Sequence, residues 1–100
     1  MDTVSAEDRA VALLYRKNHD RAPKVVAGGR GELARKIVQL AAESGVNIVS
    51  DPDLVELLSR VPTGDEIPLE LYQAVAELLA FIYQVNQDHA RSAQTEIAVR

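Results

Sequence analysis

The sequence contains no cysteine and no tryptophan, and only four of its residues are aromatic. The absence of cysteine excludes disulfide bonds and cysteine-ligated zinc sites. No apolar stretch approaches the roughly 20 residues of a membrane-spanning helix, so we predict that the chain does not itself cross a membrane. Its start, MDTVSAEDR, is polar and acidic and does not resemble a signal peptide. These absences together favour a cytoplasmic protein.

Basic clusters are also missing. The net charge is −4, from 11 basic and 15 acidic residues spread along the chain. Nucleic-acid-binding domains usually concentrate positive charge on one face, so we predict no nucleic-acid partner. What is present is a normal globular composition of 100 residues, 47% of them hydrophobic, which predicts one small domain with an aliphatic core.

Three short apolar segments have the length and composition of strands, at residues 10–15, 24–27 and 46–50. An amphipathic helix is expected between the second and third, at about residues 32–44. A strand–helix–strand unit of this kind normally has parallel strands. We therefore predict a small α/β domain with a three-stranded, mostly parallel sheet surrounded by about three helices.

The second half of the chain predicts two further helices. Asp51 and Pro52 form an N-cap and first-turn signal for a short helix that ends before Pro62. The strongest helical periodicity lies between about Ile67 and Val85. We predict a domain at residues 9–85, a polar leader at 1–8, and a frayed helix or disordered tail at 86–100.

A glycine cluster, Gly28, Gly29 and Gly31, stands where a strand should pass into a helix. Such a turn often binds phosphate. The Lys-Ser/Thr pair of a P-loop is absent, and Glu32 places negative charge at the helix start. We favour a close-packed structural turn, with a nucleotide- or phosphate-binding enzyme that uses Gly28–Gly31 as the alternative.

Other reactive side chains are dispersed. His19 and His89 are far apart in the sequence, and neither has a ligating neighbour. The adjacent carboxylates Asp65 and Glu66 lie in a polar turn, where we expect a solvated helix cap. From the residues alone we predict no catalytic residue, no metal site and no cofactor.

The apolar positions are more suggestive. Ala22 and Pro23 lie in a loop, and Val55 and Leu58 share one side of the short helix. These side chains either belong to the core or form a groove for an apolar segment of a partner.

Four segments in order resemble the cytoplasmic C-terminal domain of the export-switch proteins of flagella and type III secretion systems, the FlhB/YscU family. The first two are RAVALLY, which looks like the strand after the family's self-cleavage site, and APKVVAGGRGELARKI, which resembles APxVVAKGxGELAxxI. The others are NIVSDPDLVELL, which resembles IxExPPLARAL, and GDEIPLELYQAVAELLAFIY, which resembles GxEIPxELYxAVAExLAFVY. The resemblance covers residues 9–85.

The chain departs from this family at the self-cleavage motif Asn-Pro-Thr-His. Its four positions read Ser5, Ala6, Glu7 and Asp8, so the resemblance implies no self-cleavage here. The chain then corresponds to the fragment that cleavage would release, without the family's first strand, and the strand at 10–15 would have an open edge.

The resemblance also implies a function and partners. It implies a non-enzymatic module that binds rod- and hook-type export substrates, the hook-length regulator and the membrane-embedded export gate. The chain would act in the cytoplasm or at the inner-membrane gate, where it could replace the cleaved C-terminal fragment. The family's substrate groove, carried over, falls on Ala22, Pro23, Val55 and Leu58. An inert remnant that retains only the fold is a further alternative.

Overall fold

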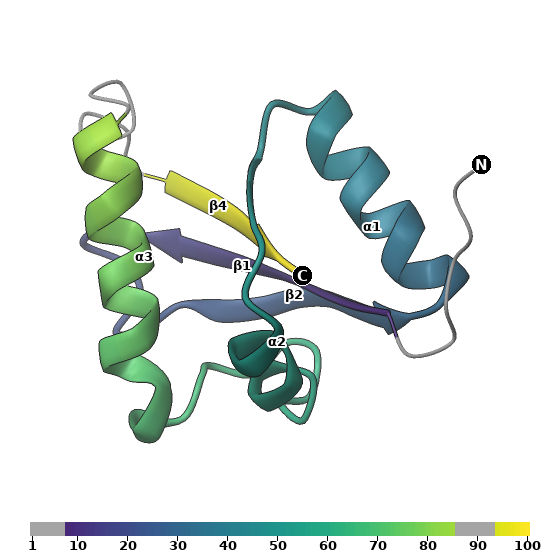
Figure 1. Cartoon of the computed structure of the whole chain (residues 1–100). Coiled ribbons are helices and arrows are strands. Elements are labelled where there is room, and N and C mark those ends of the chain that lie inside the picture. The colour runs from purple at the N-terminus through teal and green to yellow at the C-terminus, as the bar shows by residue number, and fades with distance from the viewer. Residues whose placement is uncertain (1–7, 86–93) are drawn as a thin grey trace.

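The computed structural model describes residues 8–85 and 94–100, which form a three-layer α/β domain (Figure 1). The middle layer is a four-stranded sheet with the order β2-β1-β4-β3. Its strands are β1 (Arg9–Arg16), β2 (Lys24–Arg30), β3 (Asn47–Val49) and β4 (Gln94–Val99). The helices are α1 (Glu32–Glu43), α2 (Pro52–Leu58) and α3 (Tyr72–Val85), and the 3₁₀ turn η1 (Leu69–Leu71) leads into α3.

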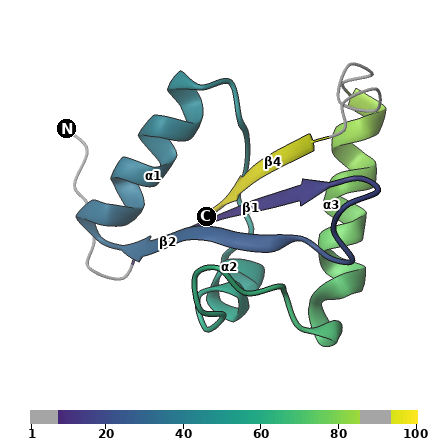
Figure 2. The ribbon, with the colours of Figure 1, turned by 180° about the vertical axis from the view of Figure 1, so that it is seen from behind.

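Alternating side chains on β1 explain the layers. Val11 and Leu13 belong to the main core, on the face covered by α2 and α3. Ala12 points to the other face, where it meets Ile37 and Leu40 of α1. Figure 2 shows α1 and α2 on opposite sides of the sheet. The sheet residues Ala12, Ala27 and Ala98 line a hollow of about 180 Å³ under α1, and bulkier residues fill the opposite layer.

The sheet is mixed, which corrects the prediction of three mostly parallel strands. β1 pairs antiparallel with both β2 and β4, and β3 pairs parallel with β4. It follows from these pairings that β2 and β3 run in the same direction, as the strand–helix–strand pattern predicts. They are not neighbours, because β1 and β4 lie between them.

The C-terminal residues are a second correction. Gln94–Val99, predicted as part of a frayed or disordered tail, form β4 in the interior of the sheet. β1 therefore has a partner on each side, and the open edge expected at residues 10–15 does not exist. Residues 86–93, in the same predicted tail, and 1–7, in the predicted leader, lie outside the described residues.

The local helix signals are confirmed. The Asp51 carboxylate accepts a hydrogen bond from the Leu54 amide at 3.1 Å and caps α2, and Pro52 occupies the first turn. Gly45 has a φ of 73° just after α1, the left-handed conformation that glycine adopts at helix ends. Among the described residues, no helix is both long and apolar enough to cross a membrane.

Candidate protein-binding groove

Ala22 and Pro23 lie at the end of the connection between β1 and β2, and hydrogen bonds hold them in place. The Pro23 carbonyl accepts a bond from the Ile67 amide at 2.9 Å, and the Val25 amide donates to the Asp65 carbonyl at 2.9 Å. The turn before η1 thus fixes the start of β2. Ala22 is buried, and Pro23 is half-buried.

The other side of this connection is held by Asp20. Its carboxylate accepts hydrogen bonds from the amide of Arg16 at 2.9 Å and from its guanidinium at 3.0 Å. The hydrogen bond from the Arg16 side chain lowers the pKa of Asp20. The carboxylate is therefore ionised at neutral pH and keeps the turn closed next to Ala22.

A hollow of about 210 Å³ opens beside Ala22 and Pro23. Its opposite wall is the first half of α3, and the residues that line it are mostly apolar. They are Tyr15, Arg21, Ala22, Pro23, Tyr72, Val75, Ala76 and Leu79. Tyr72, Ala76 and Leu79 follow the i, i+4, i+7 spacing of one helix face, so α3 presents them together.

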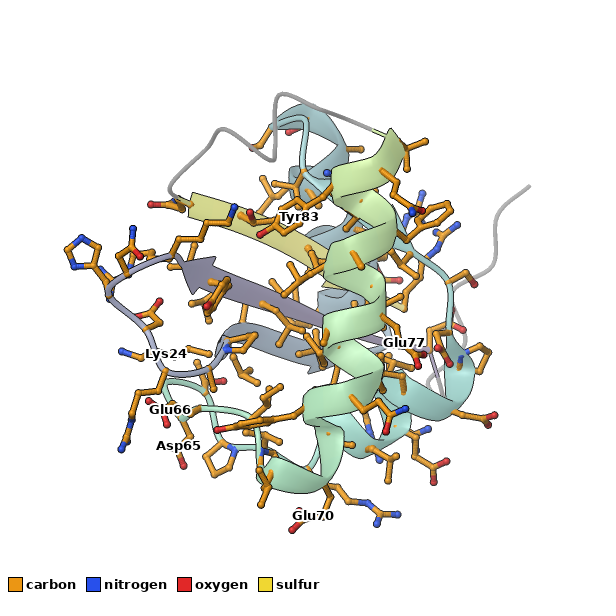
Figure 3. The ribbon with its side chains drawn as sticks, turned by 90° about the vertical axis from the view of Figure 1, so that its left-hand side faces the viewer. Lys24, Asp65, Glu66, Glu70, Glu77 and Tyr83 are labelled. Carbon is orange, nitrogen blue, oxygen red and sulfur yellow. The ribbon has the colours of Figure 1, made fainter. Side chains whose placement is uncertain are left out.

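One charged side chain, Arg21, lines this hollow, and further charges lie nearby. Arg21 forms an ion pair with Glu66 at 3.4 Å, and Lys24 pairs with Glu66 through a backbone bridge. Figure 3 shows Lys24, Asp65 and Glu66 together beside the start of α3, with Glu77 on the other side of that helix. At the far end of α3, the ammonium of Lys17 lies 4.7 Å from the centre of the Tyr83 ring. An apolar hollow with the Arg21–Glu66 ion pair at one edge suits a peptide segment.

The four groove residues predicted from the sequence fall into two pairs in the structure. Ala22 and Pro23 line the hollow, whereas Val55 and Leu58 do not. Val55 is 4% exposed, and Leu58 is fully buried, on the side of α2 that faces the sheet. Their burial supports the core interpretation. The second wall comes instead from Tyr72, Ala76 and Leu79, whose spacing in the sequence was the signal that could have identified them.

The glycine cluster is structural. Gly28 and Gly29 lie within β2, and only Gly31 stands at the start of α1. A Cβ at Gly29 would lie 2.3–2.8 Å from side-chain atoms of Leu33, so α1 packs too closely for any other residue there. Gly31 has a φ of 58°, and its amide donates to the Asp8 carbonyl at 2.9 Å. That amide is thus already bonded within the chain, which removes one donor a phosphate would need.

The remaining candidates show no site geometry. Within the described ranges, no three residues among His, Cys, Asp and Glu come together as metal ligands. His19 is in the β1–β2 connection, and His89 is outside the described residues. Of the four positions of the altered cleavage motif, only Asp8 is described, and it is exposed.

Comparison with known proteins places this geometry in a family. The sequence profile described as "FlhB HrpN YscU SpaS Family" matches residues 6–82. The chain is 43% identical over 79 residues to YlqH of Bacillus subtilis (strain 168), covering 79% of this chain and 85% of that protein. It is equally identical, over 79 residues, to the flagellar biosynthetic protein FlhB of Escherichia coli (strain K12).

The match to FlhB covers 78% of this chain but only 21% of FlhB, so the chain spans about a fifth of that protein's length. Among solved structures, the PscU C-terminal domain superposes with a TM-score of 0.71 at 28% identity, over 74% of this chain and 95% of that domain. The sequence match and the shared α/β architecture agree, and the sequence match includes the residues that line the hollow. The chain belongs to the FlhB/YscU family, and its fold is that of the family's C-terminal domain.

Proposed function

We propose that this chain is a non-enzymatic protein-binding module of the bacterial flagellar or type III export apparatus. The observation that supports it best is the hollow between the Ala22–Pro23 connection and α3, in a domain that belongs to the FlhB/YscU family. One wall is the helix α3, and the other is a connection held by backbone hydrogen bonds, so the surface is preformed and needs little ordering to bind a partner. The chain would act in the cytoplasm, at the inner-membrane export gate.

The partner that fits is a short apolar segment of an export substrate. Ala22, Pro23 and Leu79 supply an apolar floor, and Tyr15 and Tyr72 add aromatic surface with polar tips. We propose rod- and hook-type substrates and the hook-length regulator as partners. Binding them would let the chain replace the C-terminal fragment of the longer export-switch protein in the control of substrate specificity.

The proposal is tested by titrating the purified chain with peptides from early substrates, and with peptides from filament subunits as the control. Isothermal calorimetry gives the affinity, and amide chemical shifts give the location. We expect early-substrate peptides to bind and to shift the amides of residues 21–23 and 72–79. Equal binding of both peptide sets, or shifts confined to other elements, would overturn it.

The alternative, a phosphate-binding enzyme that uses Gly28–Gly31, fits this structure less well. The hollow next to Gly28 and Gly29, of about 300 Å³, is lined by Arg30 and otherwise by apolar, glycine and hydroxyl-bearing residues. The amide of Gly31 points to Asp8 rather than into an open cradle.

A further inference from the structure

β4 lies outside the part of the chain that the family profile matches. The match ends at residue 82, whereas β4 is Gln94–Val99. The strand nevertheless occupies an interior position of the sheet, between β1 and β3. The residues shared with the family thus leave a gap one strand wide, and this chain fills it with residues that the match does not include.

The pairing shows how completely the gap is filled. β4 pairs with β1 from Val11↔Val99 to Arg16↔Gln94, and with β3 from Asn47↔Ile97 to Val49↔Val99. Beyond the strand, the Arg100 amide donates to the Val49 carbonyl at 2.9 Å. In the described part of the chain, β4 is the only strand that pairs with β3. Without it, the backbone groups of β1 and β3 that face the gap would lose their hydrogen bonds.

The side chains of β4 meet a specific environment on each face. Ile97 and Val99 belong to the main core, with α2 and α3. Ala98 points the other way, towards α1, where it lines a hollow of about 180 Å³ together with Ile37 and Ala41. The Thr95 hydroxyl lies 3.3 Å from the hydroxyl of Tyr83 on α3. The gap therefore favours an extended segment that places large aliphatic side chains in the main core.

We propose that the gap between β1 and β3 is a binding site for a single β-strand, and that residues 94–99 occupy it as a built-in ligand. Such a site binds through backbone hydrogen bonds and chooses its occupant by alternate side chains. This inference is independent of the groove beside Ala22. It means that the chain fills this position with its own C-terminal strand and leaves no vacancy between β1 and β3 for a strand from another protein.

The test uses the full chain with a protease recognition sequence inserted between Val85 and Gln94. After cleavage of the folded protein, we expect native mass spectrometry to show both fragments still associated. A labelled peptide of residues 94–100 should then exchange into the complex. Dissociation of the fragments after cleavage would overturn the proposal, whether the larger fragment stays folded or unfolds.

Peptide variants test whether binding at this site depends on the side chains of the strand. A peptide with Ile97→Asp should bind more than about tenfold more weakly, because it buries a charge in the core. A matched peptide with Glu96→Gln should bind as the unchanged peptide does, because Glu96 is exposed. Equal binding of the two variants would contradict a specific strand site.

Discussion

Asp20 closes the β1–β2 connection by accepting hydrogen bonds from both the backbone amide and the guanidinium of Arg16, at 2.9 and 3.0 Å. Its side chain is only 3% exposed, although the turn itself lies at the surface. The pair lies directly before Arg21 and Ala22, so it positions one wall of the hollow. A surface ion pair is thus linked to the geometry of the candidate site.

The Arg16–Asp20 pair should make the stability of the fold depend on pH. The hydrogen bond from Arg16 lowers the pKa of Asp20 in the folded state. Its stabilisation is therefore fully present above the unfolded-state pKa of about 3.9, and is lost as the pH falls through the lower folded-state pKa. Urea unfolding from pH 6 down to pH 2 should show a smaller acid-side loss of stability in Asp20→Asn than in the unchanged protein. Identical pH profiles would contradict this role.

Adding a single methyl group at Gly31 should have a large effect on stability. Its φ of 58° and ψ of −125° belong to a region that residues with a Cβ rarely adopt. Gly31→Ala should lower the free energy of unfolding by about 1–3 kcal/mol. Gly28→Ala is the matched control, because a Cβ there would meet its nearest atoms at 3.9 Å and the position has no positive φ. Chemical denaturation measures both, and an equal loss in the two variants would contradict the assignment.

Truncation of two neighbouring residues of α2, Leu57 and Leu58, should change the stability by very different amounts. Leu58 is fully buried, and Leu57 is 43% exposed. Leu58→Ala should cost about 2–5 kcal/mol of unfolding free energy, and Leu57→Ala less than about 1 kcal/mol. If Leu58→Ala left the stability unchanged while partner binding fell, α2 would be a binding surface, as the sequence suggested, rather than a wall of the core.

Much of the fold could be predicted from local signals. The apolar runs located β1 and β2, and Asp51 with Pro52 located the start of α2 because capping is a local interaction. The antiparallel pairing of β1 and β2 was missed, although their connection, residues 17–23, is too short for a parallel crossover. The length of this connection was therefore the signal from which the antiparallel pairing of β1 and β2 could have been predicted.

β4 could not be predicted in the same way. Its six residues follow a polar stretch, and their alternation is broken by adjacent apolar residues at the end. The strand is stabilised by pairing with β1 and β3, which lie far away in the sequence, so its own residues carry little signal.

The candidate groove was predicted on one side only. Ala22 and Pro23 line the hollow, but Val55 and Leu58, which the family resemblance places in the same groove, do not. A four-stranded sheet has a wider face to cover, and it uses Leu54, Val55 and Leu58 for that purpose. Partner binding at Ala22 and Pro23 remains a prediction.

Ala76 and Ala80 allow the most direct test of the central claim. Both are exposed on α3, one turn apart, but only Ala76 lines the hollow. Ala76→Glu places a charge among apolar groups and should weaken binding of an early-substrate peptide by at least about tenfold. Ala80→Glu introduces the same charge outside the hollow and should change the affinity less than about twofold, with both proteins equally stable. Calorimetric titration of the two variants with one peptide decides the matter, and equal affinities would contradict binding in this groove.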